Sequence, residues 1–528
     1  MRIKYNILSL FILSIMASSC MDSFLDKSPY GSLNEQNFPN TEAEVFQVLT
    51  ACYSWYAQEA PELDVNLFEF GDVASDDSYK GGESDNDRPF SNDVAYFRAV
   101  SNNQLVENFW LRSYEGIYRC NQVIARIPQI TFSDEDLKKR YIAEARFLRS
   151  YFYFNLVRVY GAIPLIDRPV VYPKDDVIFP RSPESEIHLF LRKELNELAL
   201  DLPQKNQIDI NRDWGRTTQH GALAYLARVE LYFGKFQQAK EAAWNVINSG
   251  QYGLEPQFGD LFFKPKYISE ESVLEVLNTD TDGKGDASII PTYCRSRGCG
   301  GWGFNCPTQD LVNEFEDGDP RILYTITETD DLFLRRDGTP EKQNHTGYAS
   351  GDGYHSRKVF LPETRRSSRS EMEINFKIVR YADVLLMYAE AVLEGDNNLS
   401  EACKYINLVR DRARSTYKFD AEAFGTTAEE KTASRMRKVS DASLTVLQAN
   451  NTQQVRDALR KERRVELAME NLRFYDLKRW GADYAKQRIE TAKGFVIPGN
   501  YQQKLSAFPI PQRDIDRSGG AITQNEGW

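Results

Sequence analysis

The sequence predicts a mostly α-helical protein that folds as one large domain, and three observations support this fold class. Apolar residues recur at helical spacing along much of the 528-residue chain. A pair of helices joined by a short turn occurs twice, at 218–249 and at 381–414. No low-complexity linker divides the chain, so its 41% hydrophobic residues can build one core that carries long loops.

The balance of charge argues against two classes of partner. The chain has 65 basic and 77 acidic residues, which gives a formal net charge of −12. Nucleic acids and anionic lipid surfaces are held mainly by clustered lysine and arginine. We therefore expect no nucleic-acid partner and no polybasic attachment to a membrane.

The first 20 residues predict an export signal. Arg2 and Lys4 precede an apolar stretch, 5–16, that is too short to span a membrane. Small residues at 17–19 and then Cys20 have the order of a lipobox. This order predicts a lipoprotein signal peptide at 1–19 and acylation of Cys20, which would anchor the chain to a membrane. An ordinary signal peptide followed by an accidental cysteine is the alternative.

Helices are predicted in order from their caps and stop signals. Thr41 and Glu44 form a capping box that opens the first helix. Later helices begin at Ser, Asp or Pro and end at Gly or before Pro, as helix boundaries usually do. These further helices are predicted at 105–127, 133–160, 182–202, 218–249 as a pair, 381–414 as a pair, and 455–480.

The helix pair at 218–249 resembles a tetratricopeptide repeat. Gly234, Phe236 and Ala239 form the Gly-x-Phe-x-x-Ala pattern of such a turn. The pair at 381–414 has the same plan, but the two pairs are far apart in the sequence. We therefore expect helix pairs embedded in one fold and not a contiguous repeat array.

Two long segments are predicted to be loops. Glycine, proline, serine and aspartate interrupt any helical pattern at 68–103 and at 288–362. Long loops in a compact domain usually have a function, so we expect the binding site there. The tail at 507–528, which contains Pro509 and Pro511, is predicted to be extended.

Three carboxylates, Glu462, Glu466 and Glu470, fall on one face of the predicted helix at 455–480. A carboxylate-metal bundle would also need a Glu-x-x-His pattern, which is missing here. Arginines on this helix and on others favour ion pairs between helices. We therefore predict a structural role for these glutamates.

Three cysteines, Cys294, Cys299 and Cys306, cluster within 13 residues. Their spacing is a poor match to a zinc site, and no histidine lies nearby in the sequence. An exported location permits disulfides. We expect a disulfide within this cluster, with the pairing undecided.

Other patterns that suggest chemistry fail in their context. The run Gly298–Gly303 spells G-x-G-x-x-G, but no strand–turn–helix pattern frames it. The segment 280–285 begins like a calcium loop, but Lys284 occupies a ligand position and the closing glutamate is missing. We expect no cofactor, with calcium as the alternative left open.

Aromatic residues in the glycine-rich loops are the best candidates for a binding site. Flat rings can stack on the apolar faces of sugars, while adjacent carboxylates bind hydroxyl groups. Each ring could instead fix its loop to the core. The adjacent carboxylates Asp76 and Asp77 could alternatively be the acid pair of a glycosidase. The predicted ligand-binding residues are Asp76, Asp77, Tyr79, Tyr293, Trp302 and Phe304.

A series of motifs extends along nearly the whole chain. The most specific is ERRVEL at 462–467, followed by RFYD at 473–476 and by Arg479-Trp480. Together these motifs resemble, in order, those of the SusD/RagB family of outer-membrane nutrient-binding lipoproteins. The further motifs lie at 20–26, 144–149, 151–165, 215–217, 307–309, 380–386, 389–391, 407–410, 509–511 and 524–527.

The resemblance implies a SusD-like domain at 20–528, with an N-terminal part of about 20–270 and a C-terminal RagB/SusD part of about 271–528. It implies a lipoprotein of the outer membrane, exposed at the cell surface, that covers a TonB-dependent SusC-like transporter. In the starch-binding type, aromatic rings surround the glycan. Trp302 and Tyr293 match the positions of two such rings, and Tyr79 lies near a third in a loop that departs in sequence.

The resemblance and the loop aromatics together predict a function without catalysis. We expect a glycan-binding lipoprotein that captures oligosaccharide or polysaccharide and delivers it to the transporter. Three alternatives stay open: peptide binding, as the RagB branch implies, a glycan hydrolase, and a lid without a ligand of its own. The sequence does not identify the sugar or its linkage.

Overall fold

The computed structural model describes residues 38–56, 59–60, 65–170, 178–263, 269–278, 288–328, 332–334, 340–342, 352–359, 374–416 and 443–528. The predicted signal peptide, Cys20 and the calcium-like segment at 280–285 lie outside these residues. The described part of the chain is mainly helical, as the periodicity predicts, and its strands form only two-stranded pairs.

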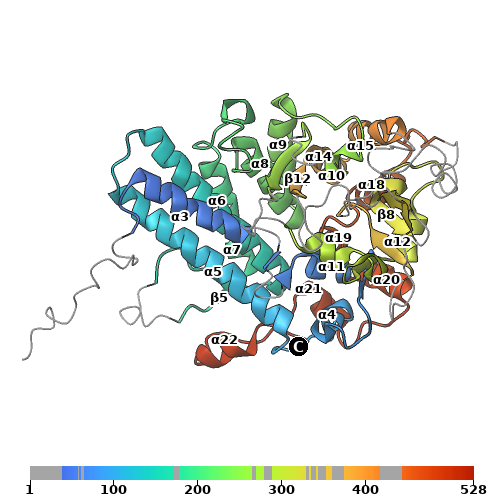
Figure 1. The fold of residues 1–528 in the computed structure, drawn as a ribbon, viewed down its shortest axis with the longest axis horizontal. Coiled ribbons are helices and arrows are strands. Elements are labelled where there is room, and N and C mark those ends of the chain that lie inside the picture. The colour runs from blue at the N-terminus through green and yellow to red at the C-terminus, as the bar shows by residue number, and fades with distance from the viewer. Residues whose placement is uncertain are drawn as a thin grey trace, which may run out of the picture.

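Three long helices pack side by side in the N-terminal part: α3 (Glu42–Tyr56), α5 (Gln104–Arg126) and α6 (Glu135–Tyr160) (Figure 1). The capping box predicted for α3 is present, because the Glu44 N–H donates to Thr41 Oγ1 at 3.3 Å and the Thr41 N–H donates to Glu44 Oε2 at 3.2 Å. Helix α6 begins after Asp134, whose carboxylate accepts two backbone N–H groups, and ends at Gly161.

The two predicted helix pairs are α8 (Gln219–Tyr232) with α9 (Phe236–Asn248) and α14 (Tyr381–Asp396) with α15 (Leu399–Ser415). Gly234 makes the first turn at a φ of 66°. Helix α9 also packs against α14, so pairs that are distant in the sequence form one continuous stack (Figure 1). The tetratricopeptide-like plan therefore extends through the middle of the fold.

The remaining elements are mostly short, and they connect and cover the long helices. The other α-helices in the described part of the chain are α4 (Pro89–Ala95), α7 (Glu184–Leu198), α10 (Asp260–Phe263), α11 (Ile290–Cys294), α12 (Gln309–Glu314), α13 (Ile322–Thr325), α18 (Thr452–Glu466), α19 (Arg473–Trp480), α20 (Ala482–Lys493), α21 (Tyr501–Ser506) and α22 (Gln512–Arg517). Within the described residues there are also a π-helix, η2 (Glu69–Val73), and three 3₁₀ turns, η3 (Ile127–Gln129), η4 (Lys205–Gln207) and η5 (Arg297–Cys299).

The strands form six antiparallel pairs in the described residues. They are β1 (Glu59–Ala60) with β2 (Val65–Asn66), β3 (Ser78–Gly81) with β7 (Phe304–Pro307), β4 (Ile163–Pro164) with β5 (Arg181–Ser182), β6 (Ser272–Val276) with β12 (Phe376–Arg380), β8 (Ile326–Glu328) with β11 (Tyr354–Ser356), and β9 (Leu332–Leu334) with β10 (Pro340–Lys342).

Three elements differ from the sequence prediction. The predicted loops contain short structured elements, among them η2, β3 and β7, because tertiary packing and strand pairing order them without helical periodicity. The predicted helix at 455–480 is two helices, α18 and α19, separated by backbone at positive φ at Met469 and Asn471. The tail, predicted to be extended, contains the short helix α22.

Close packing explains the break between α18 and α19. Gly71 of η2 lies against the backbone of Asn471, and a Cβ on Gly71 would lie only 2.4 Å from the Asn471 carbonyl oxygen. The break therefore lets the segment between the two helices contact η2. Periodicity could not reveal this contact, because it joins residues far apart in the chain.

The apolar interior has two parts that matter for the site. The larger core joins the long helices, while a smaller cluster lies beneath the loops. Among the described residues, no helix combines the length and apolar character that crossing a membrane requires. The smaller cluster consists of Phe68, Val73, Ala95, Ile290, Tyr293, Cys294, Phe304 and Val359.

Candidate ligand-binding site

One strand pair joins the two loop regions in which the sequence predicts ligand-binding residues. In the pairing of β3 with β7, Tyr79 lies opposite Cys306 and Gly81 lies opposite Phe304. Thr308 extends the junction, because its N–H donates to the Asp77 carbonyl at 2.9 Å and its hydroxyl donates to the Asp76 carbonyl at 2.8 Å. The predicted residues around 79 and around 302 therefore belong to one site.

Two glycines allow close backbone approach, Gly81 at this junction and Gly301 in the loop before β7. Gly81 has a φ of 78°, and a Cβ there would lie 2.2 Å from the Gly303 carbonyl oxygen. A Cβ on Gly301 would lie 2.1 Å from the Arg295 carbonyl oxygen. Both positions exclude any side chain, so glycine serves close backbone approach here. The junction thereby fixes the residue that follows Gly301.

That residue, Trp302, is the exposed aromatic of the site. It is 39% exposed, and its backbone N–H donates to the Thr292 carbonyl at 2.8 Å. Its ring packs edge to face against Tyr293, with 4.4 Å between ring centroids and 70° between ring planes. Such a contact orients an aromatic ring without covering it fully. Trp302 is thus a partly exposed ring with a defined orientation.

Tyr293 and Phe304 lie beneath the surface. They are 4% and 3% exposed and belong to the smaller apolar cluster. Their ring centroids lie 6.0 Å apart, and Phe68 packs against Tyr293 at 6.2 Å. Of the two interpretations open for these rings, the structure places both in the packing of the loop onto the core. They support Trp302 from below.

Arg88 is a residue of this site that the sequence analysis missed. Its guanidinium carbon lies 5.3 Å from the centroid of Tyr293 and 5.5 Å from that of Phe304, within the range of cation–π attraction. Its Nη2 also donates to Glu69 Oε1 at 2.7 Å. The only local sign is that Arg88 precedes Pro89, which opens α4. A sequence pattern does not show which rings an arginine will stack on.

Tyr79 is half-buried beside the junction. Its hydroxyl donates to the Ala492 carbonyl at 3.2 Å, which links β3 to α20. Burial, together with the nearby Asp352, raises the pKa of Tyr79 to about 12. The phenol is therefore protonated at neutral pH and acts as a hydrogen-bond donor.

Asp76 and Asp77 lie in the interior, each 0% exposed. Asp76 accepts from Arg473 Nε at 2.7 Å and from Arg488 Nε at 3.1 Å, and Asp77 accepts from Arg464 Nε at 2.7 Å. Although burial would raise it, the surrounding guanidinium groups, Arg464 foremost, hold the pKa of Asp76 well below its usual range. These carboxylates tie β3 to helices α18, α19 and α20, and they do not reach the surface.

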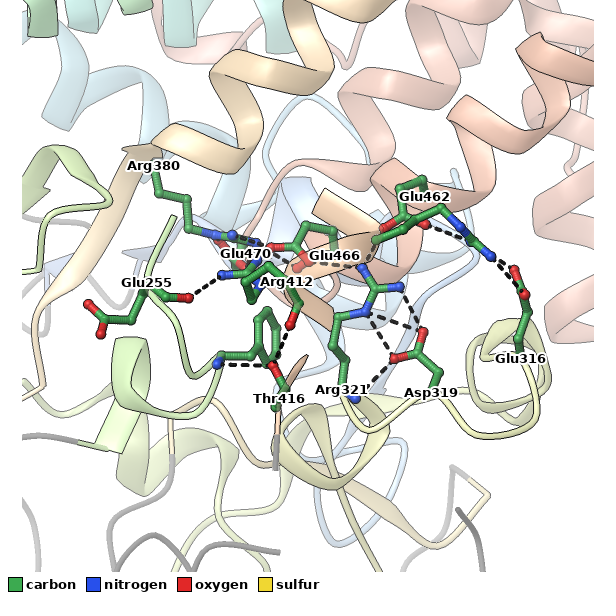
Figure 2. Close-up of polar contacts among 12 residues, drawn as sticks. Glu255, Glu316, Asp319, Arg321, Arg380, Arg412, Thr416, Glu462, Glu466 and Glu470 are labelled. Carbon is green, nitrogen blue, oxygen red and sulfur yellow. Dashed lines mark hydrogen bonds and ion pairs between the residues drawn. The ribbon is translucent and has the colours of Figure 1, made fainter. Parts of the chain in front are cut away.

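Glu462 and Glu466 of α18, and Glu470 in the break that follows it, form the predicted ion pairs with arginines of other elements, and this prediction is confirmed. Figure 2 shows Glu462, Glu466 and Glu470 surrounded by arginines from other elements. Arg321 Nη1 lies 2.5 Å from Glu462 Oε1 and 2.9 Å from Glu466 Oε2, and Arg380 Nε lies 2.8 Å from Glu470 Oε2. Arg412 bridges Glu466 and Glu271. The cluster is a buried structural network.

The prediction of a disulfide among Cys294, Cys299 and Cys306 is wrong, because no two of these sulfurs are bonded to each other in the described residues. Strand β7 directs Cys306 elsewhere, since its thiol donates to the Gly303 carbonyl at 3.1 Å. His355, distant in the sequence, lies 3.8 Å from this sulfur through its Nδ1. Even so, the described part of the chain contains no group of three metal-ligating side chains.

A separate cavity lies away from these residues, between α3 and α5. It measures about 840 Å³, and its lining includes Tyr118 and Arg119 as well as Phe38 and Pro39, where the described chain begins. None of the six predicted residues lines it. We therefore assign the candidate site to the exposed aromatic at the β3–β7 junction.

Two family models match the chain. Residues 270–528 match the model described as the SusD family. Residues 23–231 match the model described as "Starch-binding associating with outer membrane". Together the two matches cover most of the sequence.

The chain is also similar to individual proteins over most of its length. It is 25% identical to SusD-like protein P2 of Formosa agariphila, over 99% of this chain and 100% of the relative. A SusD-like protein of Bacteroides ovatus is 23% identical over 90% of this chain and 82% of its own length.

Solved structures show the same fold. A structure described as a "Laminarin binding SusD-like protein" has 26% identity and a TM-score of 0.73, and the match covers 93% of this chain and 100% of that one. A SusD-like protein from Bacteroides fragilis has 22% identity and a TM-score of 0.75, and the match covers 95% of this chain and 100% of the other.

Proposed function

The chain belongs to the SusD/RagB family, and from this premise we propose that it is a cell-surface glycan-binding lipoprotein. In this proposal it captures an oligosaccharide or polysaccharide and delivers it to a TonB-dependent SusC-like transporter in the outer membrane, without catalysis. The description of the N-terminal family match, which names starch binding and the outer membrane, supports the proposal. So does the 26% identity with a structure that is described as binding laminarin.

The observation that carries the proposal is the exposed ring of Trp302. It is supported from below by Tyr293 and placed by a backbone contact that only glycine allows. A sugar ring has an apolar face that an aromatic ring can cover, and a ring already fixed in place loses little entropy on binding. Tyr79, on the strand paired with β7, is the second candidate contact.

Binding without catalysis agrees with the state of the acidic residues. Glycoside hydrolysis needs two accessible carboxyl groups on either side of the bond, one with a raised pKa. Asp76 and Asp77 are buried and bound to arginines. Burial raises the pKa of Asp72 to about 7, but Asp72 is 0% exposed and accepts from Asn305 Nδ2 at 3.2 Å. We therefore do not assign it an acid role. The proposal needs no cofactor.

The test compares two tryptophans by isothermal titration calorimetry. Trp302→Ala removes the proposed stacking ring, and Trp244→Ala on α9 removes one with similar exposure, 41% against 39%. The ligands are laminarin and starch oligosaccharides, other plant, microbial and host glycans, and a peptide mixture. We expect one glycan class to bind, with about tenfold or greater loss of affinity in Trp302→Ala and little change in Trp244→Ala.

Each alternative function predicts a different result in the same experiment. Release of sugar products during the titration would support a hydrolase. Binding of peptides but not glycans would support the RagB-like alternative. Equal binding by both tryptophan variants would remove Trp302 from the site while leaving glycan capture in place.

A further inference from the structure

A separate cavity of about 330 Å³ is lined by residues of α12, α18, α19 and α20. None of the aromatic residues proposed for glycan binding lines it. Its lining is dominated by cationic side chains, with five cations against two carboxylates. The lining residues are Glu314, Asp457, Ala458, Arg460, Lys461, Arg464, Arg473, Tyr484 and Arg488.

The carboxylates of Glu314 and Asp310 already hold two of these arginines. Arg464 Nη1 lies 2.6 Å from Glu314 Oε2 and 2.8 Å from Asp310 Oδ2, in addition to its contact with Asp77. Arg488 Nη2 lies 3.0 Å from Glu314 Oε2 and 2.9 Å from Asp310 Oδ2. Glu314, one of the two acids of the lining, is therefore neutralised by two arginines. These ion pairs form a fixed wall.

Arg473 and Arg460 have donors that remain unused. Arg473 is 5% exposed and grips Asp76 with Nε and Nη2, but its Nη1 has no hydrogen-bond partner. Within the described residues, Arg460 forms no ion pair with a carboxylate, and its Nε is buried without a hydrogen-bond partner.

Aromatic stacking positions the Arg460 guanidinium. Its central carbon lies 4.6 Å from the ring centroid of Tyr484 and 5.0 Å from that of Trp480. A stacked guanidinium keeps its edge available for in-plane hydrogen bonds. Lys461 adds a further positive charge, and its Nζ lies 3.8 Å from Glu316 Oε1. The cavity thus combines an unused buried donor with a pre-oriented guanidinium.

We propose that this cavity binds an oxyanion, a carboxylate or a sulfate group carried by a small ligand such as an acidic sugar. Guanidinium groups bind such groups through paired, charge-assisted hydrogen bonds, and the planar edge of Arg460 offers this geometry. Burial of Arg473 strengthens its donor because few water molecules compete there. The sugar part of this inference rests on the proposed function, whereas the oxyanion part rests on the cavity alone.

The test measures binding of sodium glucuronate and sodium sulfate to the purified full chain, with glucose as the neutral control. Ionic strength is held constant with sodium chloride, so that general screening does not change. Arg460→Gln removes the stacked guanidinium. Arg456→Gln is the matched control, because it removes one charge from the same helix at a residue that does not line the cavity.

We expect saturable binding of at least one oxyanion, weakened about tenfold or more in Arg460→Gln and little changed in Arg456→Gln. Thermal unfolding confirms that each variant is folded. If Arg460→Gln is not, Lys461→Gln at the partly exposed lining position replaces it. Absence of saturable binding, or equal weakening in the Arg456→Gln control, overturns the inference.

The outcomes also separate this inference from the proposed function. A chain that binds a neutral glycan through Trp302 but neither oxyanion contradicts only the oxyanion site. A chain that binds an oxyanion in an Arg460-dependent way but no glycan contradicts only glycan capture.

Discussion

Individual residues of the candidate site depend on backbone space more than on their own chemistry. Gly301 lies so close to the Arg295 carbonyl that any side chain on Gly301 would displace the backbone of one of these two residues. Because Trp302 is the next residue, such a displacement would also move its indole away from Tyr293. The glycine is thus a positioning residue for the exposed ring.

Gly301→Ala should therefore weaken glycan binding by about tenfold or more, because the Trp302 ring loses its support. Titration calorimetry with the bound glycan measures the effect. Gly253→Ala is the matched control, since a Cβ there would meet only Glu270 Oε2 at an ordinary distance of 3.4 Å. Unchanged affinity in Gly301→Ala would show that the ring does not need this backbone contact.

Asp72 carries a prediction about pH. Its folded-state pKa is raised from 3.8 to about 7, first by burial and further by Asp77 and Glu470. Between these two values the folded chain binds a proton that the unfolded chain has released, so stability falls as pH rises from about 4 to about 7. Above pH 7 the ionised, buried carboxylate destabilises the fold fully.

Asp72→Asn should remove this penalty. We expect the variant to gain at least about 1 kcal/mol in free energy of unfolding over the native chain at pH 8, and little at pH 4. Urea unfolding at both pH values tests this. Asp516→Asn, at an exposed position, is the control. A gain that is equal at the two pH values would contradict the raised pKa.

At the residue scale the sequence could identify the loop aromatics but not their burial. Glycine-rich context pointed to Tyr79 and Trp302, and both reach the surface at least in part. Tyr293 and Phe304 share that context, yet they pack into the core, and no local pattern distinguishes the two cases. The arginines that pair with the Asp76 carboxylate lie 388 residues away or more, so its burial was equally hidden.

Among the elements, helix α18 contributes both to the buried ion-pair network and to the contacts beneath the candidate site. It carries Glu462 and Glu466 of the buried network in Figure 2, and Arg464 of the same helix pairs with Asp77 beside β3. The network joins α18 to β12, α15 and the loop before α13 through Arg380, Arg412 and Arg321. It therefore fixes the C-terminal part as a unit.

Glu466→Gln should destabilise the protein by about 3–5 kcal/mol, because three buried arginines lose a shared charge partner. Chemical denaturation measures the loss. Glu401→Gln, which removes a surface pair with Lys404 at 3.6 Å, should cost less than about 1 kcal/mol. Similar losses in the two variants would mean that the network adds no stability beyond that of a surface pair.

Helical elements were the most predictable part of the fold. Caps and periodicity predicted α3, α5, α6 and both helix pairs, because those signals are local. The break between α18 and α19 was missed because its cause is a contact with Gly71, almost 400 residues earlier in the chain. The sequence likewise did not predict β3 and β7, because the two strands that pair are far apart in the chain.

On the scale of the whole molecule, the family and its helical fold could be predicted because motifs recur along the entire chain. The membrane anchor stays a prediction, since Cys20 lies outside the described residues. Identification of the ligand depends on loops, whose sequences carry too little regular pattern to specify a sugar.

Cys20→Ser should move the protein from the membrane fraction to the soluble fraction of the cell, because acylation at that sulfur would supply the anchor. Cell fractionation followed by immunoblotting measures the distribution. Cys52→Ser, at a buried position in α3, is the control for loss of a cysteine. Membrane attachment that persists in Cys20→Ser would contradict the lipoprotein prediction.

The distance along the chain between β3 and β7 has a consequence for biosynthesis. Ser78 bonds to Cys306, 228 residues later, and Asp76 bonds to Arg473, 397 residues later. At about 5–20 residues per second, the ribosome completes β7 about 10–50 s after β3, and it adds Arg473 later still. Until then two aspartates that end fully buried must stay hydrated. The ligand site is thus among the last regions to assemble. A chain truncated before α18 would lack Arg464 and Arg473, which neutralise these two aspartates.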